Sequence, residues 1–200
     1  MPQQKIRKPP AAETGHAVNV MPVIRQRRAV RHYKPQLVGR DAVKALLSAA
    51  VQAPTAMREE AWSFAVIQDA ALLKEISDAA KELTDPETRT HLSALFHDPN
   101  FNIFYNAGTL VVICGRQAGR FVAADCWLAA ENLMLAACAM GLGSCVIGLA
   151  VDVLNMPVWK ARLGIPADVT AYAPLILGVP EGETPAVPRK APKILSWASS

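Results

Sequence analysis

The sequence predicts an α+β fold, in which helices and short strands follow one another at irregular spacing. Apolar runs rich in β-branched and aromatic residues at 62–68, 110–114 and 172–177 are typical of strands. The longest apolar helix is expected over 126–140, near the middle of the chain. Irregular spacing of this kind favours α+β over a doubly wound parallel sheet.

Length and composition are those of one globular domain. The chain has 200 residues, of which 52% are hydrophobic and 19% charged, so extensive burial is expected, in part at a subunit interface. The net charge of +4 is modest, and its basic residues cluster. A polyanion and a phosphate-bearing small molecule would both use such clusters. Few aromatic residues accompany them, which counts against nucleic acid.

The central helix has almost no polar face. Between residues 126 and 140 its polar side chains are Glu131 and Asn132. Such a helix is buried on every side, either in a core or between subunits. The uncharged run 133–151 is nominally long enough to cross a bilayer, but glycines interrupt it, so a buried helix is favoured over a membrane span. Gly141 is expected to close the helix.

The other elements follow from caps and apolar spacing. Asp41 and Asp69 are placed to cap helices, and Pro54 ends the first of these. The full expectation is a flexible arm over 1–20, a helix over 42–53, a strand over 62–68, helices over 70–83 and 87–97, strands over 110–114 and 146–149, a helix over 158–163 and a strand over 172–177. The proline-rich stretch 180–192 is expected to be extended over a surface.

Cysteine and histidine usage predicts neither disulfides nor a metal site. The four cysteines lie in apolar or helical surroundings without a C-x-x-C pair, which predicts buried, reduced thiols in a cytoplasmic protein. The four histidines lack metal-ligand spacing. No apolar signal segment is visible at the N-terminus, so secretion is not expected.

Three segments are candidates for chemistry. Arg27, Arg28 and Arg31 form a basic run, whose members either share a helical face or converge on one anion; alone, such a run is usually a solvated face. The loop within 53–62 connects a helix to a strand, where ligands often bind. The glycine-rich segment 141–148 follows a helix, whereas a dinucleotide fingerprint follows a strand, so that fingerprint is rejected.

Four motifs in a fixed order suggest a family. They are RRAVRHY at 27–33, AVQAPTAMREEAWSFAVI at 50–67, AADCWLAAENLMLAACAMGLGSCVIGLA at 123–150, and APLILGVPEGETP at 173–185 with a basic end, PRKAPKIL. This order resembles the nitroreductase family of FMN-dependent oxidoreductases, and the resemblance covers about 23–195.

The resemblance implies a fold, an assembly and an activity. It implies a mostly antiparallel central sheet flanked by helices, in one domain over 21–200. It also implies an intertwined homodimer whose arm from about 180 to 200 wraps the partner subunit. The implied reaction moves hydride from NADH or NADPH through flavin N5 to a nitroaromatic, a quinone or a similar small acceptor. No nucleic acid or membrane partner is expected, and the location is cytoplasmic.

The resemblance also implies cofactor-binding positions. Arginines of the first motif would grip the FMN phosphate and ribityl chain, and basic residues near the C-terminus would complete the phosphate site. Backbone groups of the glycine-rich segment would face the isoalloxazine, with an N–H reaching N5. The implied residues are Arg27, Arg28, Ala29, Arg31, Arg58, Ile147, Gly148, Arg189 and Lys190. No side chain is required as a catalytic nucleophile, because the flavin carries the chemistry.

The chain departs from the family pattern at three places. Ala29 stands where a serine is usual, Arg58 where an Asn contacts the pyrimidine edge, and Glu60-Ala61 where Gln-Pro is usual. Arg58 either reaches the same flavin edge or pairs with Glu59 or Glu60. These changes motivate a rival hypothesis, a flavin-free family member or a basic binding module without catalysis.

Overall fold

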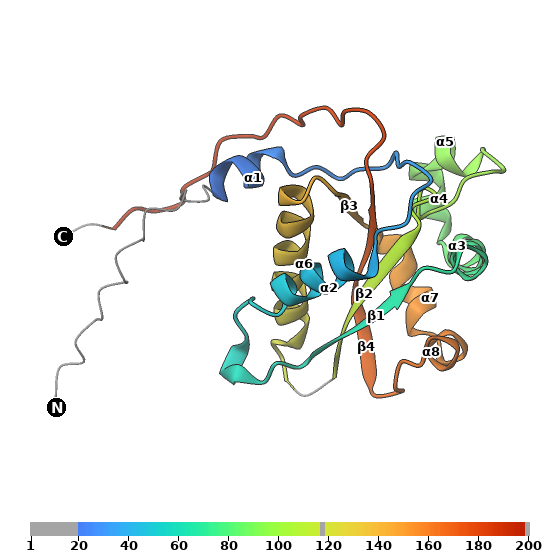
Figure 1. The fold of residues 1–200 in the computed structure, drawn as a ribbon, viewed down its shortest axis with the longest axis horizontal. Helices are drawn as coiled ribbons and strands as arrows, with labels where there is room; N and C mark the ends of the chain where they lie inside the picture. Colours follow the sequence, from blue (N-terminus) through green and yellow to red (C-terminus); the bar gives the residue numbers. More distant parts are fainter. Residues whose placement is uncertain (1–19, 117–118, 199–200) are drawn as a thin grey trace.

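The computed structural model describes residues 20–116 and 119–198, and a four-stranded antiparallel sheet lies at its centre (Figure 1). The strands are β1 (Trp62–Ile67), β2 (Thr109–Arg116), β3 (Gly143–Val146) and β4 (Val169–Gly178), in the spatial order β1-β2-β4-β3. All three pairings are antiparallel. The predicted α+β class and its antiparallel sheet are therefore confirmed.

Helices cover both faces of the sheet. The helical elements are α1 (Val20–Gln26), α2 (Arg40–Ala50), η1 (Ala56–Arg58), α3 (Ala70–Leu83), α4 (Pro86–His91), α5 (Ser93–Phe96), α6 (Val122–Ala139), η2 (Gly148–Ala150), α7 (Val151–Asn155) and α8 (Pro157–Leu163). Two clusters of buried side chains pack α2 and α6 on one face, and α3, α7 and α8 on the other.

Strand β2 shows how the sequence divides these two cores. Val111 and Ile113 belong to the cluster with α2 and α6, whereas Leu110 and Val112 belong to the cluster with α3 and α7. Successive side chains of a strand point to opposite faces, so a central strand covered on both faces needs an unbroken apolar run. This is why 110–114 contains no polar residue.

Helix α6 ends at Ala139, one residue before the expected limit, but it begins at Val122, four residues before the expected start at 126. Gly141 has φ +73°, and the N–H of Leu142 donates to the carbonyl of Ala137 at 2.8 Å, which is the glycine-closed helix end that the sequence predicts. The helix is long and apolar enough to cross a membrane by length and composition, but it packs on α2 and the sheet. On its outer side Trp127 and Leu128 remain 43% and 46% exposed.

Several expected helix limits are wrong. The helix expected over 42–53 ends at Ala50, so it is not Pro54 that stops it. Helix α2 starts at Arg40 after Gly39, which offers no side-chain cap, and Asp41 lies in its first turn rather than at the cap. The expected helix over 87–97 is two short helices, because the backbone of Leu92 leaves the helical region. By contrast, Asp69 caps α3 as predicted, accepting from the N–H groups at the second and third positions.

The expected strand over 146–149 is also wrong in position. Strand β3 occupies Gly143–Val146, and 148–150 form η2. The apolar run continues past the strand because Ile147 and Ala150 fill the core beside α7. The predicted flexible arm lies almost wholly outside the described residues. At the other end, 181–198 form no helix or strand, are exposed, and run past α1 (Figure 1).

Candidate functional site

A basic pocket of about 670 Å³ opens between α1, the segment 27–31 and the C-terminal segment. Five arginines line it, which are Arg25, Arg27, Arg28, Arg31 and Arg189. Ile24, Ala29, the uncharged residues 184–187 and one carboxylate, that of Glu131, complete the lining. The structure thus brings two segments that are far apart in the sequence to one pocket, and five of the residues implied by the family resemblance line it: Arg27, Arg28, Ala29, Arg31 and Arg189.

The segment 27–31 is held against β3 rather than continuing α1. The N–H of Val30 donates to the carbonyl of Ser144 at 3.0 Å, and Ala29 bridges Ser144 in parallel. The buried hydroxyl of Tyr33 donates to the carbonyl of Val30 at 2.7 Å. Gly143 permits this approach, because a Cβ there would lie 2.9 Å from Val30 Cβ. The alternative in which Arg27 and Arg31 share a helical face is therefore wrong.

The arginines of the basic pocket are unequally engaged. The guanidinium of Arg28 donates through one terminal nitrogen to the carbonyls of Arg25 and Arg27, while its buried Nε has no hydrogen-bond partner in the described chain. Arg27 Nε lies 3.6 Å from Glu131 Oε1. Unpaired donors in a basic cavity are what an incoming anion requires.

A second pocket of about 620 Å³ shares Arg31 with the first. We call it the amide pocket, because Asn100, Asn102 and Asn106 line it. The Arg31 guanidinium lies 5.7 Å from the centre of the Tyr105 ring, which forms part of its wall. Sequence reasoning missed this pocket, although three asparagines and three aromatic residues lie within 100–106.

The backbone of the amide pocket is strained. Tyr105 and Asn106 have φ of +52° and +55°, a left-handed conformation that costs energy, most of all for a bulky residue such as tyrosine. The Phe101 ring packs edge-on against Tyr105, with 5.9 Å between ring centres, and holds it in place. Strained residues beside a polar pocket point to a binding role.

The family model described as "Nitroreductase family" matches residues 24–179. The chain belongs to the nitroreductase family. A candidate NADH dehydrogenase/NAD(P)H nitroreductase of Archaeoglobus fulgidus is 27% identical over 166 residues, which cover 80% of this chain and 85% of the relative.

Solved nitroreductase structures share this fold. A nitroreductase with bound FMN from Bacteroides fragilis matches with a TM-score of 0.75 and 27% identity, over 90% of this chain and 98% of that one. A nitroreductase with bound FMN from Desulfitobacterium hafniense gives a TM-score of 0.74 at 22% identity, over 88% and 97% of the two chains, and this second likeness shows the fold alone.

Four predicted residues of this nitroreductase-family protein lie outside the basic pocket, and three of them are Lys190, Ile147 and Gly148. Lys190 is exposed on the C-terminal segment, next to Arg189. Ile147 is buried, and its N–H donates to the carbonyl of Pro174 at 2.9 Å. Gly148 is exposed and opens η2, so its N–H and that of Leu149 have no partner within that helix.

Arg58 also lies apart from the other predicted residues. It follows Met57 in a loop where Met57, Arg58 and Glu60 all have φ between +44° and +60°. The buried carboxylate of Asp125 anchors this loop, accepting from the N–H of Ala56 at 3.2 Å. Within the described residues Arg58 forms no ion pair, so the sequence alternative that pairs it with Glu59 or Glu60 is not observed.

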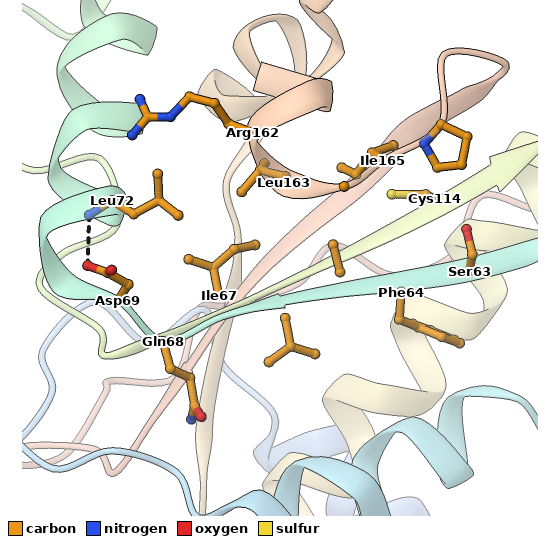
Figure 2. Close-up of a pocket in the computed structure, with 14 residues that line it drawn as sticks. Ser63, Phe64, Ile67, Gln68, Asp69, Leu72, Cys114, Arg162, Leu163 and Ile165 are labelled. Atoms are coloured by element: carbon orange, nitrogen blue, oxygen red, sulfur yellow. Dashed lines mark hydrogen bonds between the residues drawn. The ribbon is translucent and has the colours of Figure 1, made fainter. Parts of the chain in front are cut away.

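A groove of about 400 Å³ separates β1 from α8 (Figure 2). Three of its polar side chains already have structural partners: Gln68 donates to the carbonyl of Val38 at 2.7 Å, Asp69 caps α3, and Arg162 pairs with Glu75 at 2.7 Å. In the described chain β1 pairs with β2 alone, so its other edge faces this groove. The groove shares no residue with the basic pocket.

The cysteines are reduced and mostly buried, as predicted. Cys114, Cys126 and Cys145 are buried, and Cys138 is half-buried. Burial raises the pKa of Cys114 to about 11 and that of Cys126 to about 12. Neutral, buried thiols of this kind are poor nucleophiles.

Proposed function

We propose that this nitroreductase-family protein is an FMN-dependent oxidoreductase that takes its electrons from NADH or NADPH. The observation that carries the proposal is the convergence of five arginines, one with an unpartnered buried Nε, in a single pocket. Bound FMN would supply the redox chemistry, with a nitroaromatic, a quinone or a similar small molecule as acceptor.

The basic pocket suits the phosphate of FMN. Arg27, Arg28 and Arg189 reach it from two distant parts of the chain, and arginine forks donate paired, charged hydrogen bonds to phosphate oxygens. Ala29 offers no hydroxyl, and one missing hydrogen bond costs about 0.5–1.5 kcal/mol. We therefore expect FMN to be held by charge more than by neutral hydrogen bonds.

The amide pocket suits the polar edge of the flavin ring. Asparagine side chains supply both donors and acceptors, as the alternating carbonyl and N–H groups of the pyrimidine edge require. Because Arg31 lines both pockets, one elongated ligand can place its phosphate in the basic pocket and its ring near the amides. The N–H groups of Gly148 and Leu149 stay available for a ring nitrogen.

We further propose that the protein works as a homodimer in the cytoplasm. Trp127 and Leu128 of α6 are 43% and 46% exposed, and three apolar residues of α1 (Val20, Met21 and Ile24) are 47–52% exposed. Exposed apolar side chains on two helices are typical of a surface that a partner covers. α1 contacts α6 at Cys138 and η1 contacts it at Asp125, positions about 20 Å apart along the helix. A partner subunit could therefore bring its own Arg58 loop to the flavin.

The groove beside β1 gives the C-terminal segment of the partner a place to bind. An unpaired strand edge accepts an extended segment through main-chain hydrogen bonds. Truncation after Lys190 tests this, because it removes Ile194, Leu195 and Trp197 but keeps Arg189 in the basic pocket. We expect loss of the dimer by sedimentation. A truncated chain that remains a stable dimer would exclude this placement.

Cofactor binding is tested by three variants and a control. Arg27→Ala, Arg31→Ala and Arg189→Ala should each lose FMN on dialysis, while Arg40→Ala, an equal charge change at the exposed start of α2, should keep it. If all three variants retain FMN as the control does, the phosphate assignment is wrong. A wild-type protein that never binds FMN would favour the flavin-free alternative, to which the changes at Ala29 and Arg58 point.

A further inference from the structure

Glu131 contributes the one carboxylate to the lining of the basic pocket in the described chain. It lies on α6, on the same outer side as Trp127 and Leu128, and its side chain is 48% exposed. The residues one turn away on the same side of the helix are apolar, so none of them pairs with a charge at 131; they are Trp127, Leu128, Met134 and Leu135. A carboxylate repels a phosphate, so its presence in a cavity that suits a phosphate is unexpected and calls for a specific role.

Glu131 contacts Arg27, one of the proposed phosphate ligands. Arg27 Nε lies 3.6 Å from Glu131 Oε1, which is an ion pair but too long for a hydrogen bond. The Arg27 side chain is only 23% exposed, so its charge lies deeper than that of Glu131. A loose pair of this kind contributes little free energy and gives way to an acceptor with more charge and more oxygens.

We propose that Glu131 competes with the flavin phosphate for Arg27, and so weakens the preference of the site for FMN over riboflavin. The proposal rests on the proposed function. In the free protein Glu131 pairs with Arg27. When FMN binds, its phosphate displaces the Glu131 carboxylate from Arg27, and the negative charge of that carboxylate still repels the phosphate. Both effects act on the phosphate alone, since riboflavin has none.

The other arginines do not share this restraint. Arg28 is held by backbone carbonyls, and Arg31 lies against the Tyr105 ring, neither of which neutralises charge. Within the described residues no carboxylate pairs with Arg25 or Arg189. The Glu131 carboxylate therefore offsets the charge of one arginine, the relatively buried Arg27. Its removal should change phosphate binding through Arg27.

The competing explanation makes a different prediction. If Glu131 instead accepted hydrogen bonds from the ribityl hydroxyl groups, it would strengthen binding of FMN and riboflavin alike, because both carry that chain. The two roles are separated by measuring both ligands with the same variants. The isosteric change Glu131→Gln removes the charge and keeps the shape.

The experiment measures dissociation constants for FMN and riboflavin by quenching of flavin fluorescence. The proteins are the wild type, Glu131→Gln, and Glu87→Gln, which removes an equal charge on α4 outside the pocket. Glu131→Gln should bind FMN about fivefold more tightly, the upper range for one exposed charge pair, with riboflavin unchanged. In an Arg27→Ala background the gain should shrink, and high salt should reduce it.

Each other outcome decides against the proposal. Equal tightening for both flavins, or no change relative to Glu87→Gln, would show that Glu131 does not act on the phosphate. Weaker binding of both would assign it to the ribityl chain. If FMN binds to none of the proteins while their circular dichroism is native, the proposed function itself fails, and the role of Glu131 with it.

Discussion

Replacing Gly143 by alanine should disturb the basic pocket, because Gly143 packs against the segment 27–31. Gly143 opens β3, directly under the segment 27–31, and an added Cβ would lie 2.9 Å from both Cβ and Cγ1 of Val30. Ordinary contacts at a Cβ begin near 3.4 Å, so the two chains must separate by about half an ångström. Val30 is β-branched and buried, and cannot rotate away.

The expected cost follows from overpacking. Forcing one methyl group into a close-packed site costs about 1–3 kcal/mol. For a chain of this length each kcal/mol lowers the melting temperature by about 2–4 °C. The separation would also lengthen the hydrogen bond from the Val30 N–H to the carbonyl of Ser144, which is 3.0 Å long. The arginines of the segment 27–31, which this hydrogen bond positions, would shift with it.

Thermal denaturation and FMN titration measure these two effects. Gly39→Ala is the matched control, since an added Cβ there meets nothing within 4 Å. The double variant Gly143→Ala with Val30→Ala removes two of the three closest atoms and should recover part of the stability. If Gly143→Ala melts with the control and binds FMN normally, the glycine does not position the basic segment.

Three further predictions concern the loop, the thiols and the flavin edge. Asp125→Ala leaves the N–H of Ala56 without its acceptor and should lower the free energy of unfolding by about 1–3 kcal/mol, measured by thermal denaturation. Asp125→Asn keeps an acceptor and should lower it less. If both variants are as stable as the wild type, Asp125 does not anchor the loop. Because burial raises the pKa values of Cys114 and Cys126, their contribution to stability is full below pH 9 and is lost as the pH rises above it. A thiol reagent at pH 8 should therefore react with neither thiol until the protein unfolds. Rapid labelling of the native protein would contradict their burial. Arg58→Asn should lower the reduction potential of bound flavin by about 30 mV, the equivalent of 1.4 kcal/mol for two electrons; an unchanged or higher potential in a redox titration would place Arg58 elsewhere.

Local signals in the sequence predicted most of the fold. The cap at Asp69, the closing glycine at Gly141 and the apolar run of β2 each depend on neighbouring residues alone, and each appears where expected. The failures occur where tertiary contacts override local preference. Gly39, not Asp41, precedes α2, and the apolar residues after β3 enter the core through η2 rather than extending the strand.

The candidate site divides in the same way. The two basic segments were recognisable because arginines cluster in the sequence, and their convergence followed from the family resemblance. The sequence did not reveal a binding role for Glu131 or for the amide pocket, because neither forms a motif. Both can be recognised only when the fold places α6 and residues 100–106 next to the segment 27–31. In the proposed homodimer the role of Arg58 depends on the partner subunit, and a pattern within one chain does not encode that contact.

The most direct test of the proposed function is a titration of the dialysed wild-type protein with FMN. We expect a tightly bound, yellow complex with one FMN per protomer. Its flavin absorbance should be bleached by NADH or NADPH without oxygen and restored by an added quinone. A folded protein that stays colourless at excess FMN, or a bound flavin that neither NADH nor NADPH bleaches, would contradict it.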